Sequence, residues 1–348
     1  MKKIILFFAI IAGFISCKNE AIDFPDFDYT TGFFPYQYPV RTIILGNYIY
    51  DNSNDNNHRF VVSTAMGGVY KNETDRIFNF VVDESLCEDA YFGDGTIMKA
   101  LPSSYYTLSD PNKIIIPVGK MNGGVEVQLS EAFFNDPLAI KNTYVLPIRI
   151  TSVTGLDSLL QGATSSPTAD RRIAGQWTVV PKDFTMFAVK FVNPYHGSYL
   201  MRGKATVTEN GVTLGDSIYQ SKTGYVEQDE VIFLKTEGRT KVKMGNTFKS
   251  NKISGPFELI LNFTTDKYDT EGGVACTVEA VAGSSYTVSG TGKYAVDASE
   301  FGGKKRDLIE LTYTINKDNK VYTATDRLVF RDKGINMETY TVQVIPEI

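Results

Sequence analysis

Short apolar runs that alternate with polar residues, and that end at turn-forming residues, recur along almost the whole of this chain. The clearest example joins the alternating residues Leu311, Tyr313 and Ile315 to a second alternating run at 321–329, through the polar residues 316–319. Alternation places every second side chain on one face of a strand, so this segment predicts an antiparallel hairpin. A chain of 348 residues is too long for one ordinary core, which favours two all-β domains.

The first half of the chain contains short strand-like runs. They lie at 41–50, 59–65, 76–82, 113–118, 124–129 and 144–152. Asn, Asp, Gly, Ser and Pro separate them, most densely at 51–57, which is a loop composition. No helical pattern is long enough for a parallel crossover. We therefore predict an immunoglobulin-like β-sandwich over residues 40–154.

The second half repeats this pattern with longer runs. They lie at 186–192, 199–208, 231–236, 257–264, 275–280, 285–296, 307–315, 320–330 and 339–344. So many antiparallel strands would leave exposed edges unless the sheet closes on itself. We predict an antiparallel lipocalin-like β-barrel over residues 183–348. The strand pattern lapses at 155–182, and we place an interdomain linker there.

The first residues have the layout of a secretory signal. Lys2 and Lys3 precede an apolar stretch at 4–15, which is shorter than the about 20 residues that a membrane-spanning helix needs. The next residues, Phe14-Ile15-Ser16-Cys17, resemble the lipobox of bacterial lipoproteins, although Phe14 stands where Leu is more common. We expect residues 1–16 to be a signal peptide, Cys17 to carry lipid and 17–39 to form a tether. An ordinary signal peptide with a chance cysteine is the alternative.

Several further segments carry a family resemblance. They are residues 100–102, 105–108, 114–119, 144–150, 189–199 and 328–332. They resemble two-domain surface lipoproteins of Bacteroides-type bacteria, in which an N-terminal domain of unknown function with an immunoglobulin-like fold precedes a lipocalin-like domain. Genes of this family often lie beside polysaccharide-utilisation genes. The resemblance implies an outer-membrane lipoprotein that faces the cell exterior, with polysaccharide and neighbouring import proteins as partners, but it names no ligand.

Charge and composition exclude several classes of site. The formal net charge is −5 and the pI is about 5.3, so nothing matches the basic surface of a nucleic-acid-binding protein. Two histidines, together with the cysteines Cys87 and Cys276, cannot assemble a zinc site, and we expect both thiols to be buried and unpaired. Residues 51–55 imitate the start of a calcium loop, but Asn56 and Val62 replace its glycine and glutamate. We predict no metal and no cofactor.

No catalytic motif is present in the sequence. It contains neither the Gly-x-Ser-x-Gly nucleophile elbow nor a Gly-x-x-x-x-Gly-Lys-Ser/Thr phosphate loop. A glycosidase needs two carboxylates across a cleft, and nothing in the sequence selects such a pair. The predicted protein is therefore not an enzyme, and we assign no catalytic residue.

A binding site for glycan would need exposed aromatic rings with hydrogen-bonding groups beside them. Trp177 is the single tryptophan of the chain, and Tyr195 and His196 lie in the distinctive turn at 193–197. We assign these three residues to ligand binding. Two alternatives stay open, because Trp177 also suits a plug between domains and the turn also suits a purely architectural role.

Two serines resemble sites of O-glycosylation. Ser158 and Ser217 each follow Asp and precede an apolar residue, which is similar to the acceptor motif of exported Bacteroides-type proteins. The function that fits all these features is a surface lipoprotein that binds a glycan in support of polysaccharide uptake. The alternative is a structural or adhesive protein that binds another protein through an exposed strand edge.

Overall fold

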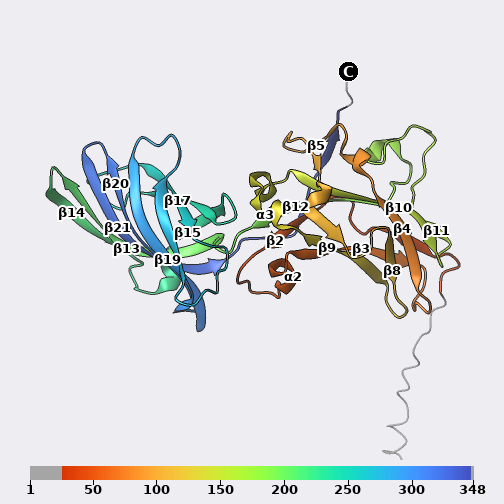
Figure 1. Cartoon of the computed structure of the whole chain (residues 1–348), viewed down its shortest axis with the longest axis horizontal. Coiled ribbons are helices and arrows are strands. Elements are labelled where there is room, and N and C mark those ends of the chain that lie inside the picture. The colour runs from red at the N-terminus through yellow and green to blue at the C-terminus, as the bar shows by residue number, and fades with distance from the viewer. Residues whose placement is uncertain (1–25, 346–348) are drawn as a thin grey trace, which may run out of the picture.

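The computed structural model describes residues 26–345, and it contains two β domains that follow each other along the long axis of the molecule (Figure 1). The predicted all-β class is confirmed, since strands dominate and the second domain closes into an antiparallel barrel. The predicted signal peptide and Cys17 lie outside the described residues. Within residues 26–345, none of the helices has the length and apolar character to cross a membrane.

The first domain is a sandwich of two sheets. One sheet consists of β11 (Ser158–Leu159), β1 (Thr31–Phe33), β3 (Arg59–Gly67), β9 (Asn122–Leu129) and β7 (Tyr106–Leu108). The other consists of β22 (Glu338–Thr339), β2 (Pro39–Ile44), β12 (Phe184–Val192), β10 (Tyr144–Thr154), β4 (Arg76–Val82) and β8 (Lys113–Ile116), with β6 (Lys99–Ala100) beside β10. A small separate sheet pairs β5 (Ala90–Phe92) with β23 (Val342–Val344).

Short helices connect these strands. They are α2 (Ser53–Asn56), η1 (Glu84–Cys87), η2 (Ser103–Tyr105), α3 (Glu131–Asn135), η3 (Pro137–Ile140) and η4 (Ala174–Gln176). The core between the two sheets follows from strand alternation: β3 buries Phe60 and Val62, and β4 in the facing sheet buries Phe78 and Phe80. Each fully buried large apolar side chain contributes about 1.5–3 kcal/mol.

The structure corrects the predicted domain boundary. The strand β12 pairs with β10 and, in parallel, with β2, so residues 184–192 belong to the sandwich and not to the barrel. Most of its side chains are buried, as expected for a strand inside a sheet that is covered on both faces. The residues 155–182 are not an interdomain linker either, since they form β11 and a loop that leads back into this sheet. Their irregular pattern comes from a long loop of the first domain.

The second domain is an up-and-down barrel of eight strands. They are β13 (Gly197–Glu209), β15 (Glu230–Thr236), β16 (Lys241–Thr247), β17 (Pro256–Phe263), β18 (Val274–Ala280), β19 (Thr287–Phe301), β20 (Lys304–Lys317) and β21 (Lys320–Asp332). Pairing of β21 with β13 closes the barrel. An additional strand, β14 (Val212–Tyr219), pairs with residues 203–209 of β13, beyond the part that pairs with β15, and η5 (Val226–Gln228) follows it.

The predicted hairpin at 316–319 is confirmed. Lys317 pairs with Lys320 across the turn, and Asp318 and Asn319 both adopt positive φ angles of 52° and 63°. A two-residue turn of this left-handed type matches the twist of the flanking strands, and Asp and Asn tolerate it better than most residues.

Aromatic side chains fill the interior of the barrel. The largest of them are Tyr195, Tyr199, Tyr294, Tyr313 and Tyr322, all fully buried. Their hydroxyls find partners inside: Tyr313 donates to Asp326 Oδ2 at 2.9 Å, and Tyr294 donates to Asp307 Oδ2 at 2.5 Å. The barrel interior is therefore a packed core, and a ligand has to be sought outside it.

The chain crosses between the domains twice, at 193–196 and at 333–337. The first crossing is fixed by Asn193, whose Nδ2 donates to Gly238 O at 2.9 Å and to Lys241 O at 2.8 Å. The second is tied to the first because the buried Lys333 Nζ donates to Pro194 O at 2.5 Å. The junction of the two domains is thus a built part of the fold.

A candidate binding cleft between the domains

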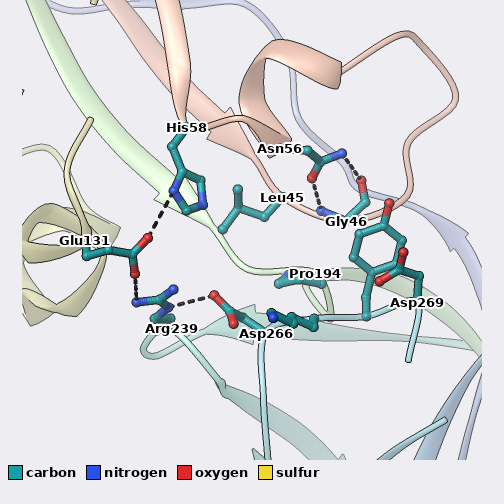
Figure 2. Close-up of a pocket in the computed structure, with 11 residues that line it drawn as sticks. Leu45, Gly46, Asn56, His58, Glu131, Pro194, Arg239, Asp266 and Asp269 are labelled. Carbon is teal, nitrogen blue, oxygen red and sulfur yellow. Dashed lines mark hydrogen bonds and ion pairs between the residues drawn. The ribbon is translucent and has the colours of Figure 1, made fainter. Parts of the chain in front are cut away.

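A cleft of about 290 Å³ lies at this junction. Its walls come from the turn before β3 and from α3 in the first domain, and from the β15–β16 and β17–β18 loops of the barrel (Figure 2). The lining residues are Leu45, Gly46, Asn56, His58, Glu131, Pro194, Arg239, Asp266, Lys267, Tyr268 and Asp269. Charged and amide groups dominate this set.

The first-domain wall is built around His58. This residue has a positive φ of 59°, and its ring lies against Phe134 with centroids 4.0 Å apart. Its Nδ1 lies 3.4 Å from Glu131 Oε1. Burial lowers the pKa of His58, so the imidazole is uncharged at neutral pH and acts as a hydrogen-bonding group.

An ion-pair bridge joins the two domains across the cleft. Arg239 on the barrel places Nη1 2.5 Å from Glu131 Oε2 and Nε 2.7 Å from Asp266 Oδ2. Figure 2 shows His58, Glu131, Arg239 and Asp266 as one continuous chain of polar contacts. The groups are partly exposed, so this bridge stabilises the fold only modestly. Its effect on the cleft is to hold charged donors and acceptors in fixed positions.

The floor of the cleft is a loop that packs against the first of the two crossings between the domains. Asn56 Oδ1 accepts a hydrogen bond from Gly46 N at 2.9 Å. Gly46 has a φ of +83°, and a Cβ there would lie 2.8 Å from Pro194, so only glycine fits. Asp55 beside it accepts from Ile44 N at 2.9 Å, which gives the polar segment 51–57 a structural role.

Tyr268 supplies the aromatic surface of the cleft. It is partly exposed and stands between Lys267 and Asp269 in the β17–β18 loop. An aromatic ring beside carboxylate, guanidinium, amide and imidazole groups can hold a polar ligand that has one apolar face. A sugar ring has this combination of surfaces.

Trp177 does not line this cleft. It lies half-buried in the loop before β12, where its Nε1 donates to Asp170 O at 2.6 Å. The Arg171 guanidinium lies 6.0 Å from the centre of the indole ring. One part of the ring surface remains accessible, so the predicted role of Trp177 in ligand binding stays a prediction.

Tyr195 and His196 are architectural, and their predicted role as ligand residues is wrong. Tyr195 is 0% exposed, because its ring stacks on Phe263 with centroids 3.6 Å apart and its hydroxyl donates to Thr265 O at 2.5 Å. His196 accepts a hydrogen bond from Thr236 N through Nδ1 at 3.1 Å. Burial lowers the pKa of His196 to about 3, so it is uncharged in the fold.

The remaining predicted residues lie on strands or in the cores. Ser158 is on β11 and Ser217 on β14, and both are half-buried, so their O-glycosylation stays a prediction. Cys87 and Cys276 are free and buried, as predicted. Within residues 26–345, no group of three or more His, Cys, Asp and Glu side chains could hold a metal ion.

Sequence reasoning did not find the residues of the cleft. One signal was present, because Tyr268 is an aromatic residue in a polar loop between two clear strands. His58, Glu131 and Arg239 gave no such signal, since they come from three separate connections of the fold. Only the docking of the two domains brings them together.

Two family models match the chain. One, described as a domain of unknown function, DUF5627, matches residues 194–334, and the other, described as an N-terminal domain, matches residues 27–157. Both ranges agree with the two observed domains. A comparison with curated proteins gave no match.

Solved structures of Bacteroides proteins are similar to the chain. A multidomain protein including DUF1735 from Bacteroides ovatus is 12% identical, with a TM-score of 0.38, and covers 87% of this chain and 93% of its own. An auxiliary nutrient binding protein from Bacteroides thetaiotaomicron is 10% identical, with a TM-score of 0.36, and covers 84% of this chain and 90% of its own. TM-scores this low do not establish a common fold.

A third structure is much more similar. It is a structural-genomics protein of unknown function from Bacteroides ovatus, 37% identical with a TM-score of 0.83, and the match covers 92% of this chain and all 100% of that one. Identity at this level over both domains means common descent, and the chain therefore belongs to the two-domain Bacteroides family of that protein, with a second domain of the DUF5627 type.

Proposed function

We propose that this protein binds a glycan at the junction of its two domains and does not cleave it. The observation that carries the proposal is the cleft itself, in which the Tyr268 ring faces the same space as the charged groups of Glu131, Arg239 and Asp269. Its volume of about 290 Å³ lies just below the usual range of ligand pockets, about 300–1,000 Å³. It has room for one or two sugar units of a longer polymer.

The chemistry of a sugar matches the groups on both walls. The C–H face of the ring would lie on Tyr268, and hydroxyl groups would donate to carboxylates such as Glu131 and accept from Arg239. The part of the proposal that excludes cleavage is supported by Arg239, which is paired with both Glu131 and Asp266. A glycosidase needs two carboxyl groups that both act on the glycosidic bond, whereas here one guanidinium engages both carboxylates.

We expect a Tyr268→Ala variant to lose at least about fivefold in affinity for the glycan. Stacking of a planar ligand on an aromatic side chain is worth about 1–3 kcal/mol by analogy with bases on such platforms. A glycan array with the wild-type protein identifies the ligand, and isothermal titration calorimetry then compares the variants. The matched control is Tyr225→Ala, since Tyr225 is 67% exposed and does not line the cleft.

Three outcomes decide this proposal. If the array shows no binding to host, plant or microbial glycans, glycan binding is excluded. If Tyr268→Ala keeps full affinity, the ligand does not sit in the cleft. In that case a loss of affinity in Trp177→Ala would place the ligand on the loop before β12, as the sequence suggested.

We also propose that Cys17 is lipidated and anchors the protein in the outer membrane, facing the exterior, where neighbouring import proteins would receive the glycan. The support is the sequence 14–17. Acyl chains contribute about 0.8 kcal/mol per buried methylene, so several chains hold a protein on a membrane almost permanently. A Cys17→Ser variant should move to the soluble fraction on cell fractionation. Wild-type protein that mass spectrometry finds unmodified and free of membrane would contradict the anchor.

One observation favours adhesion to another protein as a second candidate function. Among the described strands, β14 pairs with β13 alone, and its Ile218 is 80% exposed. An open edge of this kind can accept a strand from a partner. If the protein has this function, it binds a protein partner in the absence of glycan. Substitutions that block pairing along β14 should abolish that binding, whereas Tyr268→Ala should leave it unchanged.

A further inference from the structure

A second cavity of about 320 Å³ lies on the other side of the loop that forms the floor of the cleft. Residues 45–46 of this loop line the first cavity, and 47–49 line the second. The barrel contributes Lys305 and Arg306 from β20. The two cavities are thus neighbours at the same domain junction, and an extended ligand could occupy both.

Arg306 has an unusual environment for an arginine of this protein. Every other arginine in residues 26–345 forms at least one hydrogen bond or ion pair. Within the same described residues, the Arg306 side chain has no hydrogen-bond or ion-pair partner, and its Nε atom is buried. Its guanidinium lies 4.2 Å from the centre of the Phe301 ring, a contact that holds the group in place. A guanidinium that is held in place and has no acceptor within the protein can donate hydrogen bonds to a bound anion.

The carboxylate next to Arg306 does not neutralise it. Asp307 is buried and uses both oxygens elsewhere. Its Oδ2 accepts from Tyr294 at 2.5 Å, its Oδ1 accepts from Asp297 N at 3.1 Å, and Asn47 Nδ2 lies 3.2 Å from each. Lys305 and Asp297 also line the cavity and are both exposed, so the positive charge of Lys305 offsets the Asp297 carboxylate and Arg306 remains as the cation without a partner.

The first-domain wall of this cavity supplies an aromatic surface. Tyr48 lines the cavity and packs edge-on against Tyr50 with centroids 5.5 Å apart. Tyr50 itself is 69% exposed. A ring on one wall and a guanidinium fork on the other match the two features of an acidic sugar, its apolar face and its carboxylate.

We propose that this second cavity binds the carboxylate of an acidic sugar, so that the glycan held at the junction is a uronate-containing polymer. The carboxylate would form a two-point contact with Arg306. That the anion is carried by a sugar rests on the proposed function, whereas the anion site itself rests on the cavity and on Arg306.

Calorimetry with a matched pair of ligands tests this inference. The probes are an oligogalacturonate and its methyl ester, which has the same sugar units without the charge. We expect the acid to bind the wild-type protein at least tenfold more tightly than the ester. In Arg306→Ala this preference should disappear. The matched control is Lys304→Ala, which removes the same charge at an exposed position two residues away that does not line the cavity.

Two further measurements make the result specific. Thermal unfolding shows that Arg306→Ala is folded, and Arg306→Lys, which keeps the charge but not the fork, should recover only part of the preference. Equal affinity of the wild type for acid and ester would overturn the anion site, and so would an equal loss in Lys304→Ala. If neutral glycans still bind through Tyr268, the proposed function survives that failure. Binding of monomeric galacturonate through Arg306, without binding of any oligosaccharide, would support the anion site and contradict the glycan function.

Discussion

A Tyr195→Ala variant should unfold at lower urea concentration than the wild type, with a loss of about 3–5 kcal/mol in the free energy of unfolding, as for other large aromatic side chains removed from cores. Tyr195 is fully buried, and it stacks on Phe263 and packs edge-on against Tyr294 with centroids 5.1 Å apart. The variant also leaves Thr265 O without its donor. Urea titration followed by circular dichroism measures this loss.

The exposed Tyr225 again provides the matched control, since its replacement by alanine should change stability by less than about 0.5 kcal/mol. This experiment separates the two roles of the 193–197 turn. Unchanged stability in Tyr195→Ala, together with a loss of glycan affinity, would show that the ring serves the ligand and not the core.

The second large effect is a loss of stability at acidic pH, which originates in His196. Burial, and then the nearby Lys333, Lys190 and Lys235, lower its pKa from the ordinary 6.5 to about 3. Because the folded pKa lies below the unfolded one, the unfolded state binds the extra proton between pH 6.5 and 3. Stability therefore falls as the pH falls through this window, by about 1.4 kcal/mol per pH unit from this group alone.

A His196→Asn variant isolates this contribution. The amide oxygen can accept the hydrogen bond from Thr236 N in place of Nδ1, but the side chain does not titrate. Between pH 6.5 and pH 4 the wild type should lose about 3 kcal/mol more than the variant. The comparison with the variant is needed because burial raises the pKa of Asp326 to about 6. This carboxyl raises the stability of the fold as the pH falls from 6 to 4, which opposes the effect of His196. An equal loss in the two proteins would contradict the account of His196.

The sequence predicted those parts of the fold that depend on neighbouring residues. The hairpin at 316–319 was predicted because its two strands alternate and its turn is polar. Closure of the barrel was predicted from the number of consecutive antiparallel strands. The placement of β12 failed because strand patterning does not reveal which strands pair, and β12 pairs with β2, far away in the sequence.

The cleft depends on contacts that the sequence does not encode locally. Tyr195 and His196 share a segment with Pro and Gly, a composition that suits both an exposed turn and a buried crossing between domains. The observed crossing buries both rings. In contrast, His58 and Arg239 have ordinary loop sequences around them, and they become part of one site only because the chain crosses between the domains twice.

Hydrogen–deuterium exchange of the full-length protein, with and without the tightest-binding glycan, tests the central claim most directly. A ligand between the domains should slow exchange on both walls, in peptides that cover residues 44–58 of the first domain and 264–273 of the barrel. Exchange in the loop around Trp177 should stay the same. Protection confined to one domain, or to residues 160–183, would contradict a binding site at the junction.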